Sequence, residues 1–186
     1  LGDNPVMVYA GQELGEKGMD IEGYSGMDGR TSIFDYWGVK SLQAWANKGK
    51  FDGKNLDKEQ KELRKFYQKL LTVARDEKAI NDGLMYDLEY AQADHFNKHE
   101  QFAFLRKKED DLLLMVANFD DKQVDIDVHI PTDAFEYLHQ KEWKKATAVD
   151  LLTGNKMKKT SLCSTQPVHL TLPAWKGVVL KISPAQ

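Results

Sequence analysis

The stretch Pro5-Val-Met-Val-Tyr-Ala-Gly-Gln-Glu-Leu-Gly15 joins a short apolar run directly to a turn that contains Gly11, Glu13 and Gly15. A second dense patch, Gly29-Arg-Thr-Ser-Ile-Phe-Asp-Tyr-Trp37, follows it. An α/β barrel forms the mouth of its site in this way, with polar and aromatic residues placed after the carboxyl end of a strand. We therefore expect residues 6–9 to be a barrel strand. Because this strand comes almost at the start of the chain, we expect its neighbours to belong to a larger protein.

Length and composition set limits on the class of protein. The chain has 186 residues, enough for one domain or for one domain and part of another. Its hydrophobic fraction of 41% and net charge of −3 are those of an ordinary soluble protein, and they give no electrostatic footprint for nucleic acid. No apolar run approaches the roughly 20 residues that span a bilayer. The sequence predicts neither a nucleic-acid partner nor a membrane span, and is compatible with a cytoplasmic, periplasmic or secreted location.

Cysteine and histidine usage predicts no metal site and no cofactor. Cys163 is the only cysteine, so no internal disulfide can form, and we expect this thiol to be buried as a small apolar group. The histidines do not cluster along the chain. Asp20, Glu22 and Asp28 interleave with glycines, but their spacing is not that of an EF-hand loop.

The pattern changes from helical to extended near Asn81-Asp82-Gly83. Before it, residues 37–49 have helical spacing, and Asp57 with Gln60 has the form of a capping box. The helix that this box predicts carries an apolar stripe, which we expect to pack into a core: Leu63, Phe66, Tyr67, Leu70, Leu71 and Ala74.

After Gly83 the pattern is that of short strands separated by turns, which predicts an antiparallel sandwich. Residues 124–130 and 167–172 alternate, residues 112–117 form a continuous apolar run typical of a strand buried on both faces, and residues 177–182 form a further strand. Residues 135–143 interrupt the pattern as a short helix or an insertion. We expect Trp143 and Trp175 in the sandwich core, and the lysines at 144–145 and 156–159 on a solvated edge.

Several of these segments resemble the α-amylase family, glycoside hydrolase family 13. Residues 6–15 are similar to that family's eighth barrel strand, and residues 29–37 to its R-x-P-M-x-W loop, with Ser32 in place of the usual proline. Residues 63–75, followed by Ala79 and Gly83, resemble its last barrel helix. Residues 102–106 and 113–119 resemble the first strands of its C-terminal sandwich.

The resemblance implies an α+β chain: a remnant of a (β/α)8 barrel at residues 1–82, with its last strand and helices, followed by an all-β antiparallel sandwich at residues 83–186. It implies a parent enzyme that is a retaining glycoside hydrolase acting on α-glucans or oligosaccharides. The motifs that carry that family's catalytic carboxylates do not occur here, so we expect this chain alone to be inactive. Its expected protein partner is either the missing N-terminal barrel or a second copy, through residues 1–36.

No catalytic residue is predicted, and the site candidates are residues at the substrate rim: Glu13, Arg30 and Trp37. Glu13 is either a group that bonds substrate or one that fixes the loop by an ion pair. Arg30 either contacts sugar hydroxyls or pairs with a carboxylate. Trp37 either stacks on a sugar ring or packs in the core. The alternative function is a non-catalytic carbohydrate-binding or structural sandwich module.

Overall fold

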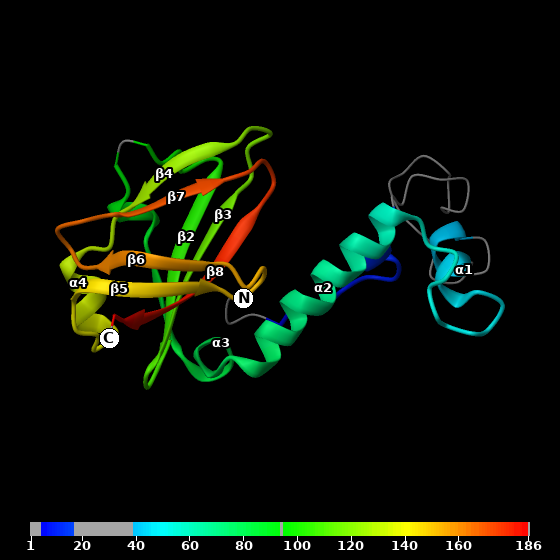
Figure 1. Ribbon diagram of the computed structural model, residues 1–186, viewed down its shortest axis with the longest axis horizontal. Helices are drawn as coiled ribbons and strands as arrows, with labels where there is room; N and C mark the ends of the chain where they lie inside the picture. Colours follow the sequence, from blue (N-terminus) through cyan, green and yellow to red (C-terminus); the bar gives the residue numbers. More distant parts are fainter. Residues whose placement is uncertain (1–4, 17–38, 94, 186) are drawn as a thin grey trace. The chain divides into compact units, whose positions relative to one another are not determined.

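The computed structural model describes residues 5–16, 39–93 and 95–185 (Figure 1). The chain forms two compact units, Asn4–Thr72 and Val73–Gln186, and the division falls within the long helix α2 (Lys58–Asp76). A separate domain boundary at residues 82 and 83 stays a prediction.

The first unit is built from helices. It contains the 3-10 turn η1 (Gln12–Leu14), the helix α1 (Lys40–Ala46) and most of α2. The predicted capping box at the start of α2 is confirmed: Gln60 N donates to Asp57 Oδ1 at 2.8 Å, and Asp57 N donates to Gln60 Oε1 at 3.1 Å. These bonds satisfy two backbone donors at the helix start, which explains why α2 begins at Lys58.

Residues 6–9 lie in no sheet of the described residues, and their assignment as a barrel strand stays a prediction, because that expectation places their neighbours in a larger protein. They are extended, but no strand of the described residues pairs with them. Val6 and Met7 are 77% and 79% exposed. A strand is defined by its ladder to a neighbour, so an extended segment without one stays irregular. No barrel is closed by the described part of the chain.

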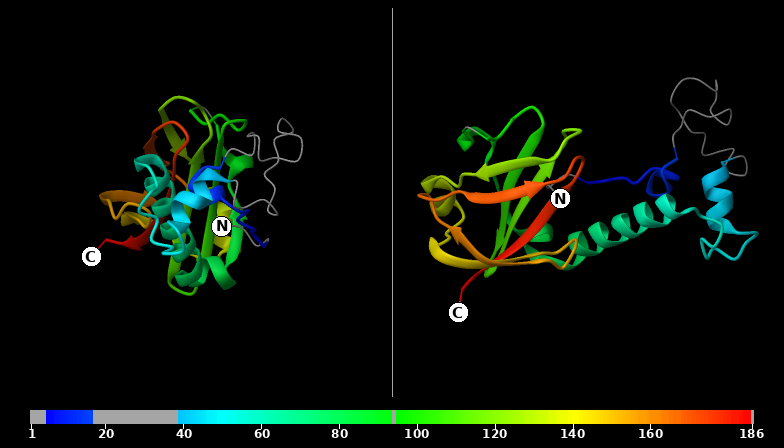
Figure 2. Two further views of the ribbon diagram at one scale, coloured as in Figure 1. Left: turned by 90° about the vertical axis from the view of Figure 1, so that its right-hand side faces the viewer. Right: turned by 45° about the horizontal axis from the view of Figure 1, so that its top comes forward.

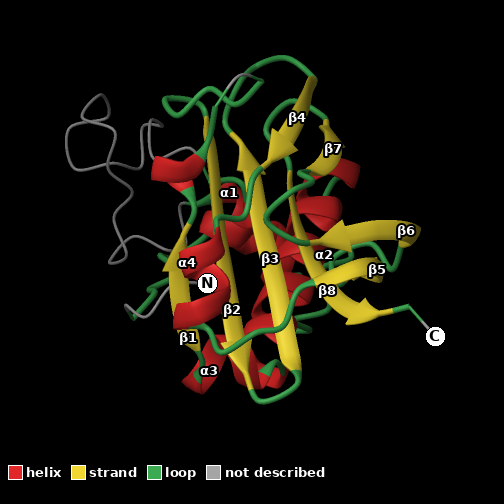
Figure 3. Ribbon diagram, turned by 90° about the vertical axis from the view of Figure 1, so that its left-hand side faces the viewer, coloured by secondary structure: helices red, strands yellow, loops and turns green. Residues whose placement is uncertain are grey.

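The second unit begins with the last turn of α2 and continues as a mostly antiparallel β structure (Figure 3). Its elements follow in the order α3 (Lys78–Asp82), β1 (Leu84–Asp87), η2 (Glu89–Ala91), β2 (Gln101–Lys108), β3 (Asp111–Asn118), β4 (Val124–Val128), α4 (Thr132–Tyr137), β5 (Trp143–Asp150), β6 (Lys156–Leu162), β7 (Val168–Leu172) and β8 (Gly177–Pro184).

The strands form two sheets that share one core. The larger sheet has six strands in the order β1-β2-β3-β8-β5-β6, and the smaller pairs β4 with β7; every pairing is antiparallel. Figure 2 shows β4 and β7 side by side. Core residues come from both sheets, among them Leu105, Leu114, Ile126, Leu170 and Leu180.

β3 is buried on both faces, as its continuous apolar run predicts. Leu112, Leu114 and Val116 point into the core between the sheets. Leu113 and Met115 belong to a second apolar cluster on the opposite face, with Val73 from α2 and Ala79 and Ile80 from α3. The end of α2 and the short α3 therefore cover the outer face of the six-stranded sheet.

Several other sequence expectations are confirmed, but the position of Trp175 differs. β4 and β7 alternate as predicted, Cys163 is 2% exposed, and the interruption at 135–143 contains the end of α4. Trp143 packs against the core, but Trp175 is 65% exposed. Trp175 has a φ of 55° in the turn before β8, and this left-handed turn keeps the ring out of the alternation that a strand would impose.

The apolar stripe of α2 packs only in part, which corrects a further expectation. Phe66 and Leu71 are 46% and 48% exposed, whereas Val73 is 5% exposed. Val73 and Ala74 belong to or pack against the apolar cluster on the sheet, whereas Phe66 and Leu71 keep much of their apolar surface in solvent.

Candidate functional site

Of the predicted rim residues, the structure describes only Glu13. Arg30 and Trp37 lie outside the described residues. Glu13 is half-buried in η1, directly after the extended residues 5–9.

Two glycines fix the turn that carries Glu13. Gly11 has a φ of 83° and Gly15 a φ of 73°. Residues other than glycine adopt such positive φ values only at a cost in free energy. A Cβ on Gly11 would lie 2.8 Å from the Cβ of Glu16. Glu16 N donates to Gly11 O at 3.0 Å and closes the turn. The Gly-rich pattern in the sequence is therefore a requirement of this geometry.

Hydrogen bonds attach the turn to both helices of its unit. Gln12 Nε2 donates to Tyr67 Oη on α2 at 3.0 Å, and Gln12 Oε1 accepts from Tyr9 N at 3.1 Å. Ser41 Oγ on α1 donates to Glu16 Oε2 at 2.6 Å. These side-chain bonds hold Glu13 in a defined position, although the segment before it lies in no sheet.

The turn and the helices enclose a groove of about 500 Å³. Its lining residues are Val8, Tyr9, Ala10, Gly11, Glu13, Leu42, Arg64, Tyr67, Gln68 and Leu71. Glu13 is the one carboxylate among these described lining residues. A glycosidase needs a pair of carboxylic groups at the scissile bond, so this lining can bind hydroxyl groups but does not supply that pair.

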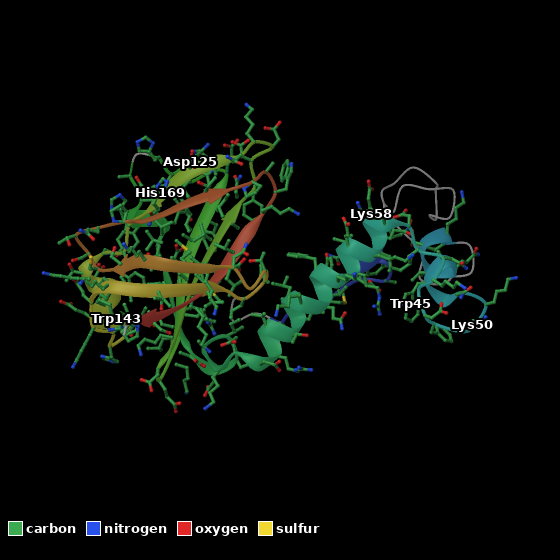
Figure 4. All side chains as sticks on the ribbon, in the orientation of Figure 1. Trp45, Lys50, Lys58, Asp125, Trp143 and His169 are labelled. Carbon is green, nitrogen blue, oxygen red and sulfur yellow. The ribbon has the colours of Figure 1, made fainter. Side chains whose placement is uncertain are left out.

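Arg64 gives the groove its positive charge. Its guanidinium carbon lies 5.7 Å from the centroid of the Trp45 ring, within range of a cation–π contact (Trp45 is labelled in Figure 4). Arg64 Nε is buried and has no hydrogen-bond partner among the described groups. A buried N–H group without an acceptor is unfavourable, so this donor lacks, in the described part of the chain, a partner that the fold would normally supply.

Sequence reasoning misses the helix side of the groove. Arg64, Tyr67, Gln68 and Leu71 follow the i, i+3, i+4, i+7 spacing of one helical face, and this spacing could have identified them as one surface. The sequence pattern places Tyr67 in the apolar stripe instead. Its hydroxyl bond to Gln12 depends on a contact 55 residues away, which no local pattern predicts.

The described residues contain no group of three or more His, Cys, Asp or Glu side chains placed to hold a metal ion. Within the same residues, no helix has the length and apolar character needed to cross a membrane.

The sequence matches no protein-family model and no curated protein. Solved structures do resemble this fold. AmyP in complex with maltose is 17% identical, with a TM-score of 0.51 over 71% of this chain and 22% of that one. A variant of AmyP in complex with maltotriose is also 17% identical, with a TM-score of 0.51 over 72% of this chain and 23% of that one.

Glycoside hydrolases are among the similar structures: an Anoxybacillus α-amylase is 16% identical, with a TM-score of 0.49 over 68% of this chain and 23% of that one. At these identities the AmyP likeness shows the fold alone. The chain spans less than a quarter of the length of these solved structures.

Proposed function

We propose that this chain is the C-terminal portion of an α-amylase-type glycoside hydrolase that acts on α-glucans with retention. In this proposal residues 1–82 complete an α/β barrel with its last strand and helices, and residues 83–186 are the C-terminal sandwich domain. The catalytic carboxylates belong to the rest of the parent enzyme. The chain contributes scaffold and substrate rim, with Glu13, Arg30 and Trp37 at the rim.

Apolar surface in the first unit carries this proposal. Val6 and Met7 are more than three-quarters exposed at 77% and 79%, in an extended segment that no described strand pairs. Phe66 and Leu71 on α2 are nearly half exposed. Exposed apolar surface and unpaired extended backbone are both unfavourable in water, and both are satisfied when a further layer of protein covers them. A barrel that surrounds residues 6–9 with strands supplies such a layer.

An activity assay tests the first consequence. The purified chain should not turn over soluble starch or an activated aryl α-glucoside, because loss of a nucleophile or acid typically costs many orders of magnitude in rate. Turnover above the buffer blank that follows the protein through purification would contradict the proposal.

The genomic sequence upstream of Leu1 tests the family directly. The proposal requires an open reading frame there that encodes further barrel strands, including one ending in His-Asp. A natural protein that starts at this point, or an upstream domain of another class, would contradict it.

Hydrogen exchange tests the segment itself. In a dilute monomer of this chain, the amides of Val6, Met7 and Val8 should exchange far faster than those of β4, because only β4 has a ladder partner. Equal protection would mean that residues 6–8 find their partner within this chain and that the barrel-remnant proposal is wrong.

A separate observation favours the second candidate, a carbohydrate-binding module. Tyr86, Tyr90 and Tyr137 form an aromatic cluster, with ring centroids 6.3 Å apart for Tyr86 and Tyr90 and 5.5 Å apart for Tyr86 and Tyr137. Tyr90 and Tyr137 are 59% and 51% exposed. Exposed aromatic faces suit the apolar C–H faces of pyranose rings.

The Asp133 carboxylate bonds two tyrosines of this cluster. Asp133 Oδ2 accepts from Tyr90 Oη at 2.6 Å and from Tyr86 Oη at 2.7 Å. These bonds, that of Tyr90 first, hold the pKa of the Asp133 carboxyl below its usual range, so it is ionised at neutral pH and can accept from sugar hydroxyls.

A titration of the full chain with maltoheptaose separates the two candidates. The binding module requires saturable binding that Tyr90→Ala and Tyr137→Ala each weaken and that Trp175→Ala, a matched change of an exposed aromatic residue elsewhere, leaves intact. Absence of binding would remove the second candidate and leave the first untouched.

A further inference from the structure

A groove in the second unit is lined by lysines and a histidine, and no acidic residue is among its described lining residues. Its volume is about 670 Å³. Lys144 and Lys145 on β5, Lys159 on β6 and His169 on β7 line it, with Thr160 and Ser161 between them. Figure 4 shows His169 on β7, in the part of the unit that also contains β5 and β6. This volume lies within the range of small-molecule sites, about 300 to 1,000 Å³.

A β-bulge places both β5 lysines on this groove. In the pairing of β5 with β6, Trp143 is opposite Leu162 and Ala146 is opposite Thr160, so two lysines oppose Ser161 alone. Both lysines are exposed, whereas Trp143 and Ala146 on either side of them pack into the core. Strict alternation would turn Lys145 toward the core, and the extra residue turns it outward instead.

Protection of a sheet edge explains only part of this arrangement. Lysines on an edge strand block pairing with other chains, and this accounts for Lys159 because β6 is the edge of its sheet. The ladder between β5 and β8 begins at Ala146, and before it Lys145 O accepts a hydrogen bond from Ala185 N. Lys144 can therefore protect an edge as well, but edge protection does not account for the bulge that turns Lys145 to the same groove.

The charge of the groove is local. The whole chain carries a net charge of −3, so a general excess of lysine does not produce it. An acid lies beside the groove rather than among its lining residues: His169 Nδ1 is 2.9 Å from Asp127 Oδ1 on the neighbouring strand. Like charges that line one groove repel one another, and an anion relieves this repulsion.

The lining points to a phosphate group as the ligand. Ammonium groups bind phosphate as point charges, and hydroxyl groups of Ser and Thr donate to its oxygens. Beside these donors, Ala146, Met157 and Pro167 supply an apolar surface, and Gln166 supplies an amide. We propose that this groove binds a phosphate-bearing small molecule, either free phosphate or a phosphate monoester of a sugar.

Titration of the full isotope-labelled chain, followed by amide chemical shifts, tests this site. Inorganic phosphate, glucose 6-phosphate and glucose are added separately at about 0.15 M salt, which screens weak surface attraction. We expect saturable shifts at Lys145, Thr160, Ser161 and His169 with both phosphates and none with glucose. Equal affinities would identify the free anion as sufficient, and tighter binding of the ester would show that the sugar contributes.

Matched variants give the decisive comparison. Lys144→Gln together with Lys145→Gln should lower the affinity at least about tenfold, because charge-assisted bonds to phosphate are lost. Lys98→Gln together with Lys122→Gln makes the same change of net charge at exposed lysines outside the groove and should leave the affinity unchanged. Lack of saturation, equal loss in both pairs, or equal shifts with glucose would overturn the proposal.

Discussion

Arg106 Nε donates a hydrogen bond to the carbonyl oxygen of Ala79 at 2.9 Å, although the Arg106 side chain is only 1% exposed. Arg106 Nη2 donates to Ile80 O at 2.6 Å. Arg106 lies on β2, and both acceptors belong to α3. A buried cation thus joins the short helix to the outer face of the sheet, at a place where apolar packing alone would leave helix carbonyls without donors.

Replacing Arg106 with methionine should destabilise the second unit strongly. The apolar stem is kept, but the Ala79 and Ile80 carbonyls lose their donor, at an expected cost of about 2 to 4 kcal/mol. Urea unfolding measures this cost. Lys122→Met, at an exposed turn, should change stability by less than about 0.5 kcal/mol. Equal costs for the two variants would mean that the guanidinium bonds do not stabilise the fold.

Gly83→Ala should destabilise the second unit, because the added methyl group would clash with the carbonyl oxygen of Ala79. A Cβ on Gly83 would lie 2.3 Å from Ala79 O and 2.7 Å from Lys107 O, so the backbone must move. The expected cost is at least about 2 kcal/mol.

Gly154→Ala is the control for this substitution. Gly154 has a φ of 80°, and no atom lies within 4 Å of the position that a Cβ would take there, so only backbone strain of about 1 kcal/mol is expected. Thermal unfolding should rank Gly83→Ala below Gly154→Ala in stability. The reverse order would contradict the close approach of α3 and β2.

Local signals in the sequence predict much of this fold. The Asp57 and Gln60 pair predicts the start of α2 because a capping box satisfies its own backbone donors. The continuous apolar run at 112–117 predicts a strand buried on both faces. β3 is such a strand, since each of its faces meets an apolar cluster.

Features that depend on distant partners are not predictable in this way. Residues 6–9 have the composition of a strand, but a strand requires a neighbour, and no described strand provides one. The alternation pattern does not reveal β5, because the bulge at Lys144-Lys145 breaks it. At the candidate site, the glycine turn indicates Glu13, whereas the Gln12–Tyr67 bond that positions the turn joins residues far apart in sequence.

Tyr86 should make stability fall with rising pH. Burial first, and then hydrogen bonds with Tyr90 and Asp133, raises the pKa of Tyr86 well above its ordinary value of 10.0. In the unfolded chain this phenol ionises at about pH 10. The folded state therefore binds the proton more tightly, so its contribution is complete below about pH 10 and is lost as the pH rises above that value.

Urea unfolding between about pH 8 and pH 11 measures this effect. In Tyr86→Phe the decline of the unfolding free energy with pH should be shallower than in the parent chain. Tyr137→Phe removes a phenol from the same aromatic cluster but not from the bonds to Asp133, and it should leave the slope unchanged. A slope that Tyr86→Phe does not alter would show that this hydroxyl titrates alike in both states.

Two residues of α2 should differ sharply in their contribution to stability. Val73 is 5% exposed and packs with Leu113 and Met115 against the sheet, so Val73→Ala should cost about 2 kcal/mol through lost burial and a residual cavity. Leu71 is 48% exposed, so Leu71→Ala should cost less than about 1 kcal/mol although it removes a larger side chain. Urea unfolding of the dilute monomer measures both costs. If Leu71→Ala costs as much as Val73→Ala, then the exposed stripe of α2 is covered in solution by this chain itself, and the apolar surface that supports the proposed function is absent.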